Sequence, residues 1–227
     1  MDMKNKRIVC WMFLLSLSLL TSCLKDEIPD GAELRDKRTE QPSDPSNNLL
    51  NGHEYVDLGL PSGLKWATCN IGANQPEEVG AYYAWGEIET KSEYTEANSK
   101  TYSKSMGDIS GSPLYDVASA EWSASWRIPT TSEFRELINE CEWQRTVQEG
   151  RCGYVVIGPN GKRIFFPAVG YRHGLYVYEN GTNGYYWTSE PVESDVYSAY
   201  YLYLGASDFY IDSYYRSGGY NVRPVSK

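Results

Sequence analysis

The sequence lacks most of the motifs that carry enzyme chemistry. It has two histidines, His53 and His173, and no G-x-S-x-G segment, which removes the usual framework of a serine hydrolase. His53-Glu54 is not followed by the second histidine of an H-E-x-x-H zinc helix. The Gly158–Lys162 segment is too short for a phosphate-binding loop. We therefore expect no enzyme activity and no catalytic residue. The alternative is a glycosidase, because the 30 acidic residues leave open a closely spaced pair of catalytic carboxylates.

Cysteine is scarce beyond the first 30 residues, which contain Cys10 and Cys23. The remaining three, Cys69, Cys141 and Cys152, form no C-x-x-C pair, so their spacing gives no zinc site. Two arrangements fit this odd number: one disulfide with one free thiol, or three free thiols.

The N-terminal apolar run is too short to span a bilayer. Ile8–Leu20 covers 13 residues and follows a basic start, whereas a spanning helix needs about 20 residues. Such a run suits a secretory signal peptide over residues 1–22. Small residues before Cys23 resemble the lipobox of bacterial lipoproteins, in which the cysteine is acylated, for example with palmitate. Several acyl chains would hold the protein on a membrane.

The residues after Cys23 indicate which membrane carries the anchor. Lys25-Asp26-Glu27 resembles the export tag of surface lipoproteins in Bacteroidota-type bacteria. We expect an outer-membrane location that faces the cell exterior, with the periplasmic leaflet as the alternative. Residues 23–49 are rich in charge and proline and, from Leu24, have no aromatic residue, which predicts a disordered tether. Treated as a flexible coil, this tether spans about 30 Å.

Positive charge is in deficit throughout the chain. The full sequence has 21 Lys+Arg and 30 Asp+Glu, and removal of residues 1–22 leaves 18 and 29, a formal charge of −11. Such a surface repels phosphate backbones, which argues against nucleic-acid binding. It offers no basic patch to anionic lipids either, so membrane attachment depends on the acyl anchor.

Residues 50–227 have the composition of one folded domain. Strands are predicted at Glu54–Gly59, Leu64–Ile71 and Ala81–Ile88, followed by a polar loop over residues 89–114. Asp116–Trp122 could form a short helix. A clearer helix begins at Thr130, because Thr130 and Glu133 have the spacing of a capping box. An apolar stripe follows at helical spacing: Phe134, Leu137, Ile138 and Cys141.

The remainder of the domain reads as β structure with no internal repeat. A Pro159–Lys162 turn joins the first two predicted strands. The strand candidates are Tyr154–Gly158, Arg163–Val169, Tyr185–Ser189, Tyr197–Leu204, Phe209–Tyr214 and Tyr220–Val225. Strands, one or two helices and then a loop-rich antiparallel region define the class α+β.

Four segments in this order resemble the Fibrobacter succinogenes major paralogous domain family. They are YVDLGLPSGLKWATCNIGA (55–73), WRIPTTSEFREL (126–137), YWTSE (186–190) with residues 199–205, and GYNVRPV (219–225). Arg127-Ile128-Pro129-Thr130 and Val222-Arg223 are also distantly similar to sulfatase-modifying, formylglycine-generating proteins. The resemblance implies a C-type-lectin-like fold, in which the first and last strands meet and long loops carry the ligand site. The late cysteine pair of the formylglycine-generating enzymes is missing, so their oxidase chemistry is not expected.

Structural roles account for several residues of these motifs. Arg127 and Arg223 are expected to tie loops through carboxylates or carbonyls. Four tryptophans are expected in the core: Trp66, Trp85, Trp126 and Trp187.

The ligand candidates are the tyrosines near the glycine-rich turns of the C-terminal third. Thirteen of the 20 tyrosines lie between Tyr171 and Tyr220, where amphipathic rings suit stacking on a sugar or contact with a protein. The alternative is that these rings pack beneath the loops. The candidate set, with neighbouring hydrogen-bond donors, is Tyr171, Arg172, His173, Tyr176, Tyr178, Tyr185, Tyr214, Tyr215 and Arg216.

Two further hypotheses concern calcium and assembly. Lectins of the expected fold coordinate calcium through carboxylates and amides in the general region that Glu190, Glu193 and Asp195 occupy in this sequence, and calcium requires such hard oxygen ligands. The Glu-Pro-Asn and Trp-Asn-Asp triplets of those lectins are absent from this sequence. A solvated acidic loop is the alternative, and no other cofactor is expected. The predicted function is non-catalytic recognition of a glycan or a surface protein. The second hypothesis is a structural or adhesion subunit of a surface appendage, and the oligomeric state is open.

Overall fold

The computed structural model describes residues 48–227. The predicted signal peptide (1–22), the predicted lipidation site Cys23 and the predicted tether up to residue 47 lie outside the described residues. The last residue of that predicted tether, Leu49, begins the strand Leu49–Leu50. In the described part, the longest helix has 10 residues, and none is long and apolar enough to cross a membrane.

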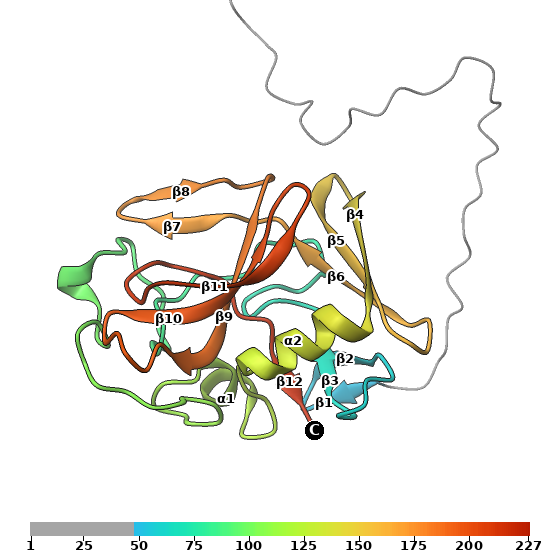
Figure 1. Ribbon diagram of the computed structural model, residues 1–227, viewed down its shortest axis with the longest axis horizontal. Coiled ribbons are helices and arrows are strands. Elements are labelled where there is room, and N and C mark those ends of the chain that lie inside the picture. The colour runs from blue at the N-terminus through green and yellow to red at the C-terminus, as the bar shows by residue number, and fades with distance from the viewer. Residues whose placement is uncertain (1–47) are drawn as a thin grey trace, which may run out of the picture. The chain divides into compact units, whose positions relative to one another are not determined.

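The described residues form an α+β fold in which the paired strands are antiparallel (Figure 1). Two α helices and a 3-10 turn lie at α1 (Val117–Trp122), α2 (Thr131–Glu140) and η1 (Glu96–Asn98). The first six strands are β1 (Leu49–Leu50), β2 (His53–Asp57), β3 (Lys65–Ala67), β4 (Glu142–Gln148), β5 (Arg151–Ile157) and β6 (Arg163–Pro167). The last six are β7 (Tyr171–His173), β8 (Tyr176–Tyr178), β9 (Gly184–Pro191), β10 (Ser198–Leu204), β11 (Phe209–Tyr215) and β12 (Val225–Ser226).

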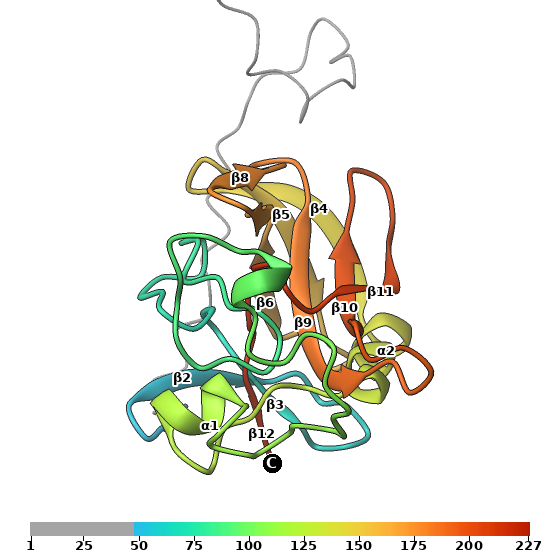
Figure 2. The same cartoon turned by 90° about the vertical axis from the view of Figure 1, so that its left-hand side faces the viewer.

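The first and last strands meet in one sheet of order β1-β2-β3-β12. Trp66 of β3 lies opposite Val56 of β2 on one side and Val225 of β12 on the other. The last strand therefore lies beside the first strands of the described residues, below the remaining strands in Figure 2.

Two three-stranded sheets, β4-β5-β6 and β11-β10-β9, and the two-stranded sheet β7-β8 form the rest of the framework. The core has two clusters, one around Trp85, Trp126 and Trp187, the other around Trp66 and Phe134 of α2. All four predicted core tryptophans are confirmed as buried, each at most 1% exposed. Burying a large apolar side chain stabilises the fold by about 1.5–3 kcal/mol, so these rings dominate the packing.

Both predicted helices are confirmed, and their caps explain where they begin. Thr130 Oγ1 accepts the Glu133 N–H at 3.2 Å, and Glu133 Oε2 accepts the Thr130 N–H at 2.8 Å, which completes the capping box. Asp116 caps α1 by accepting the Ala118 and Ser119 N–H groups. Phe134 and Leu137 are fully buried on the predicted apolar stripe, whereas Ile138 and Cys141 are half-buried beside it.

The two arginines expected to tie loops do so. Arg127 pairs with Glu133, with Nη2–Oε1 at 2.5 Å. Arg223 is completely buried and donates to Asn70 Oδ1 and to the carbonyls of Ala67 and Thr68. These neutral acceptors and the Phe166 ring, which lies 4.6 Å from the guanidinium, surround the Arg223 side chain. Burial accordingly lowers the pKa of Arg223.

Two of the predicted strands are wrong and a third is too long. Ala81–Ile88 is irregular: only Tyr83 makes a bridge, to Tyr220, and Gly86 has φ +71°. Tyr220–Val225 likewise has only isolated bridges, at Tyr220 and Asn221, before the regular strand β12 begins at Val225. Leu64–Ile71 shortens to β3. In Ala81–Ile88, hydrogen bonds to distant segments replace the expected regular strand pairing; for example, the Trp85 N–H donates to the Arg216 carbonyl.

Cys69 and Cys141 are free thiols, so no disulfide joins them. Burial raises the pKa of both, to about 11 for Cys141. Neither thiol is therefore activated as a nucleophile at neutral pH.

Candidate functional site

One side of the β9–β11 sheet is covered with tyrosine rings. Strand pairing places Tyr203 opposite Tyr210, Tyr201 opposite Asp212 and Tyr185 opposite Tyr203. Since alternate residues share a side of a sheet, these rings and Tyr214 face the same way. The β7–β8 hairpin adds its own tyrosines to this side. We call the set the tyrosine face: Tyr171, Tyr176, Tyr178, Tyr185, Tyr201, Tyr203, Tyr210 and Tyr214.

The rings of the tyrosine face form a continuous row from the hairpin to the sheet. Tyr176 and Tyr178 have centroids 6.4 Å apart, and Tyr178 stacks on Tyr171 at 5.4 Å. Tyr171 meets Tyr185 at 4.8 Å. The row continues from Tyr185 to Tyr203 at 5.4 Å and from Tyr203 to Tyr210 at 5.0 Å. All these separations lie in the range of favourable aromatic pairs, so each ring is held by its neighbours.

The ends of the row are open to solvent while its middle is packed. Tyr176 is 66% exposed, Tyr178 42% and Tyr210 44%, whereas Tyr185 is only 8% exposed; Tyr214, which lies on the same face outside the row, is 49% exposed. Leu175 and Val177 lengthen the exposed apolar segment at the tip of the hairpin. Four consecutive exposed apolar side chains are unusual on a protein surface in contact with water, so the tip of the hairpin is a candidate for contact with a ligand.

The residues between the rings are carboxylates. Glu179 Oε2 accepts the Tyr185 hydroxyl at 2.5 Å and the Asn183 amide at 2.6 Å. Asp212 Oδ2 accepts the Tyr201 hydroxyl at 3.4 Å. Burial and these carboxylates raise the pKa of both tyrosines, which therefore remain neutral hydrogen-bond donors at physiological pH.

The structure brings five of the nine predicted ligand residues onto the tyrosine face: Tyr171, Tyr176, Tyr178, Tyr185 and Tyr214. Tyr185 is buried, so it supports the surface rather than offering a ring to a ligand. His173 is exposed at the end of β7.

The two predicted arginine donors serve the fold. Arg216 is 1% exposed; its Nε donates to the Ser198 carbonyl and its guanidinium lies 4.6 Å from the Trp85 ring. Arg172 donates to the carbonyls of Lys91 and Ser92 and lies over the Tyr94 ring at 5.2 Å. Arg172 therefore fixes the β7–β8 hairpin against the loop at residues 91–94.

Tyr215 belongs to a separate, smaller aromatic group. It projects to the opposite side of β11 from Tyr214 by alternation, although the neighbouring rings touch at 5.1 Å. Its ring and that of Tyr197 both pack against Tyr102, at 6.0 and 5.0 Å.

Sequence reasoning missed five groups of this site: Tyr201, Tyr203, Tyr210, Glu179 and Asp212. The signal that could have found the tyrosines is their spacing. Tyr201 and Tyr203 are two residues apart on one strand and Tyr210 and Tyr214 are four apart on the next, so each pair lies on one side of its strand. The strand boundaries alone do not reveal this pairing; it depends on the register of β10 with β11.

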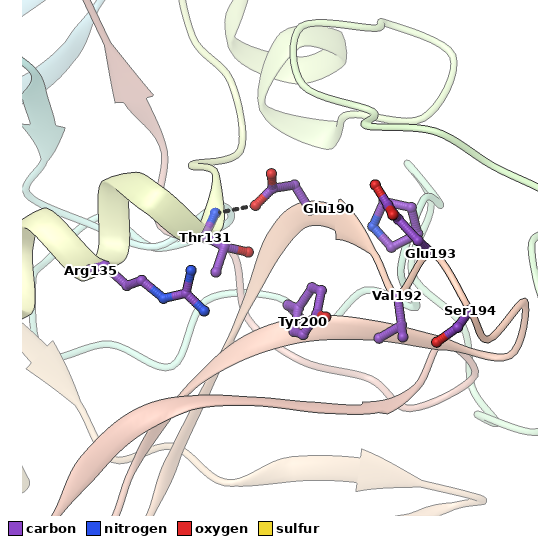
Figure 3. Close-up of a pocket in the computed structure, with 8 residues that line it drawn as sticks. Thr131, Arg135, Glu190, Val192, Glu193, Ser194 and Tyr200 are labelled. Carbon is purple, nitrogen blue, oxygen red and sulfur yellow. Dashed lines mark hydrogen bonds between the residues drawn. The ribbon is translucent and has the colours of Figure 1, made fainter.

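Two of the three acidic residues predicted as calcium ligands, Glu190 and Glu193, line a cavity of about 390 Å³ at the start of α2, whereas Asp195 is not part of its lining. Figure 3 shows Glu190 bonded to the Thr131 N–H, at 2.7 Å, with Arg135 and Glu193 on the cavity wall. Asp195 Oδ1 accepts the Tyr197 N–H and closes a turn.

Glu190 and Asp195 thus have structural bonds of their own. Residues 48–227 contain no group of three or more His, Cys, Asp or Glu side chains placed to hold a metal ion. Calcium binding stays a prediction, to be tested by titration.

Comparison with known proteins adds no relative: no family model, no curated protein and no solved structure matches this chain.

Proposed function

We propose that this chain is a lipid-anchored surface protein that recognises a glycan or protein ligand, without catalysis, through its tyrosine face. The observation that carries the proposal is the continuous row of rings whose ends, Tyr176, Tyr178 and Tyr210, are more than 40% exposed. Tyrosine supplies a large amphipathic contact at low cost in side-chain entropy, which is why it is enriched in binding surfaces.

The way the rings are held supports recognition over simple packing. Exposed rings stabilise a fold little, yet Tyr178 packs on the half-buried Tyr171 and Tyr210 on the half-buried Tyr203, so the orientation of both rings is set in advance. A preorganised surface loses less entropy when a ligand binds. The hairpin that carries Tyr176 and Tyr178 is also fixed from behind by Arg172.

The proposed architecture is C-type-lectin-like, as in the Fibrobacter succinogenes major paralogous domain family. The pairing of β3 with β12 supports this proposal, because the first and last strands of that fold meet. The buried Arg223 and the capped helix after Pro129 give structural reasons for two of the motifs that carry the resemblance. Acylation of Cys23 and an outward-facing outer-membrane location are proposed from the sequence alone.

An appendage subunit, the second hypothesis, would use open strand edges to join copies. β11 is such an edge strand, and its residues 209, 211, 213 and 215 turn their backbone groups away from β10. However, Asp212 Oδ1 accepts the Ser213 N–H at 2.8 Å, in the middle of this edge. A charged residue that occupies the edge opposes strand addition, so recognition by the tyrosine face is the better-supported function.

The experiment compares intact protein with Tyr178→Ala/Tyr210→Ala and with Tyr115→Ala, an exposed tyrosine outside the face. All three are screened on a glycan array and by co-purification from the surface of the producing cells. We expect one saturable ligand, weakened about tenfold or more by the double variant and unchanged in the control. Equal binding by the double variant, or no ligand in either screen, would refute the proposal.

A further inference from the structure

The charged groups that act on the tyrosines of the tyrosine face are negative. Glu179 acts on Tyr171, Tyr185 and Tyr203 and raises the pKa of each, after the larger effect of burial. Asp208 acts on Tyr203 in the same way, and Asp212 on Tyr201. The charged groups that shift these four tyrosines are all carboxylates, whereas arginines act on Tyr82, Tyr94 and Tyr186 elsewhere in the domain.

The three carboxylates are available to a ligand. Glu179, Asp208 and Asp212 are all exposed. The basic side chains at the border of the face are directed to the loops: Arg145 Nη2 donates to the Thr182 carbonyl, and Arg151 Nη1 donates to Asn180 Oδ1. The face therefore presents negative charge between aromatic rings.

We infer that the tyrosine face binds a positively charged, lysine- or arginine-bearing segment of a protein partner. This inference rests on the proposed function and names the class of ligand that the face takes. A cationic side chain uses both features of the surface: its methylene stem lies along an apolar ring, while its charged group meets a ring face or a carboxylate.

A cationic peptide fits this surface better than a glycan does. An acidic glycan is repelled by Glu179, Asp208 and Asp212, and a neutral one can donate hydrogen bonds to these carboxylates but adds no attraction between opposite charges. An extended peptide places alternate side chains on one side about 7 Å apart. The exposed rings of Tyr176 and Tyr178, 6.4 Å apart, are close to that spacing and can receive successive basic side chains. The net charge of the chain, −9, favours approach of the same partner.

The test measures fluorescence anisotropy with intact protein in detergent and a labelled peptide of alternating arginine and serine. The matched probe replaces each arginine with citrulline, which keeps the shape and removes the charge. The variants are Asp208→Asn/Asp212→Asn and Tyr178→Ala/Tyr210→Ala. The control, Glu140→Gln/Glu142→Gln, removes the same charge from exposed positions on α2 and β4. Circular dichroism checks that each variant is folded.

The arginine peptide is expected to bind saturably and the citrulline peptide to bind at least about tenfold more weakly. Each face variant should weaken binding about fivefold or more, the control should not, and added salt should weaken binding. Equal binding of the two peptides, equal losses in the control, or no saturable binding would overturn the inference. A neutral glycan that binds through Tyr178 and Tyr210, with no peptide binding, would leave the proposed function standing and remove only the cationic partner.

Discussion

Arg172→Ala should loosen the β7–β8 hairpin without unfolding the domain. The guanidinium donates to the carbonyls of Lys91, Ser92 and Leu175 at 3.0–3.4 Å and lies over the Tyr94 ring. Hydrogen bonds from a charged donor contribute about 1.5–3 kcal/mol when well made, and these are long and partly exposed, so a total loss of about 2 kcal/mol is expected. That loss corresponds to roughly a 30-fold increase in local opening.

Hydrogen exchange measures this opening directly. The Tyr94 and Gly174 amides bond to each other's carbonyls between the 91–94 loop and the hairpin, and they should exchange roughly 30-fold faster in the variant. The Trp187 amide, bonded to the Asn221 carbonyl in the core, is the internal control and should change much less. Arg172→Lys, which keeps the positive charge but removes the planar guanidinium, should accelerate exchange at these amides by an intermediate factor. Unchanged exchange at Gly174, or equal acceleration at Trp187, would refute the role of Arg172 as the anchor of the hairpin.

Three other predictions concern stability and metal. Asp116→Ala should lower the free energy of unfolding by about 4 kcal/mol. The Asp116 carboxylate accepts hydrogen bonds from the N–H groups of Gly111, Ala118, Ser119 and Ile128, and loss of these bonds leaves buried donors unpaired. A decrease below about 1 kcal/mol, measured by urea denaturation, would contradict this prediction. Although burial alone would raise the pKa of Glu133, hydrogen bonds from Arg127 and the Thr130 N–H lower it from 4.5. Glu133 therefore stabilises the fold above pH 4.5, and the stability gap to Glu133→Gln should shrink as pH falls through the lowered pKa; a gap that persists in acid would argue against the ion pair. If Glu190, Glu193 and Asp195 bind calcium, excess calcium should raise the melting temperature and Glu193→Gln should abolish the rise; no shift with calcium would remove that hypothesis.

Local signals account for the parts of the fold that the sequence predicted well. The Thr130 capping box and the turn at Pro159–Lys162 depend on neighbouring residues, and helix α2 and the β5–β6 hairpin follow them closely. By contrast, β4 has the polar sequence EWQRTVQ and gains its partner only through pairing with β5. The β7–β8 hairpin escaped prediction for a similar reason, since each of its strands has three residues.

The candidate site was predictable in kind but not in detail. The density of tyrosines after residue 170 located the region. Whether a given ring is exposed depends on contacts between distant segments: Tyr185 is covered by Tyr171, Tyr203 and Tyr220, and Arg216 lies over Trp85, 131 residues earlier in the sequence. No local pattern contains those pairings, so Tyr185 and Arg216 looked like surface residues.

The most direct test of the tyrosine face is site-specific photo-crosslinking on the cells that produce the protein. A benzophenone amino acid replaces Tyr210 in one variant and Tyr115, equally large and exposed but outside the face, in the other. The account predicts a discrete adduct from position 210, suppressed by Tyr178→Ala in the same chain, and none from position 115. Adducts of equal yield at both positions, or no adduct from position 210, would contradict it.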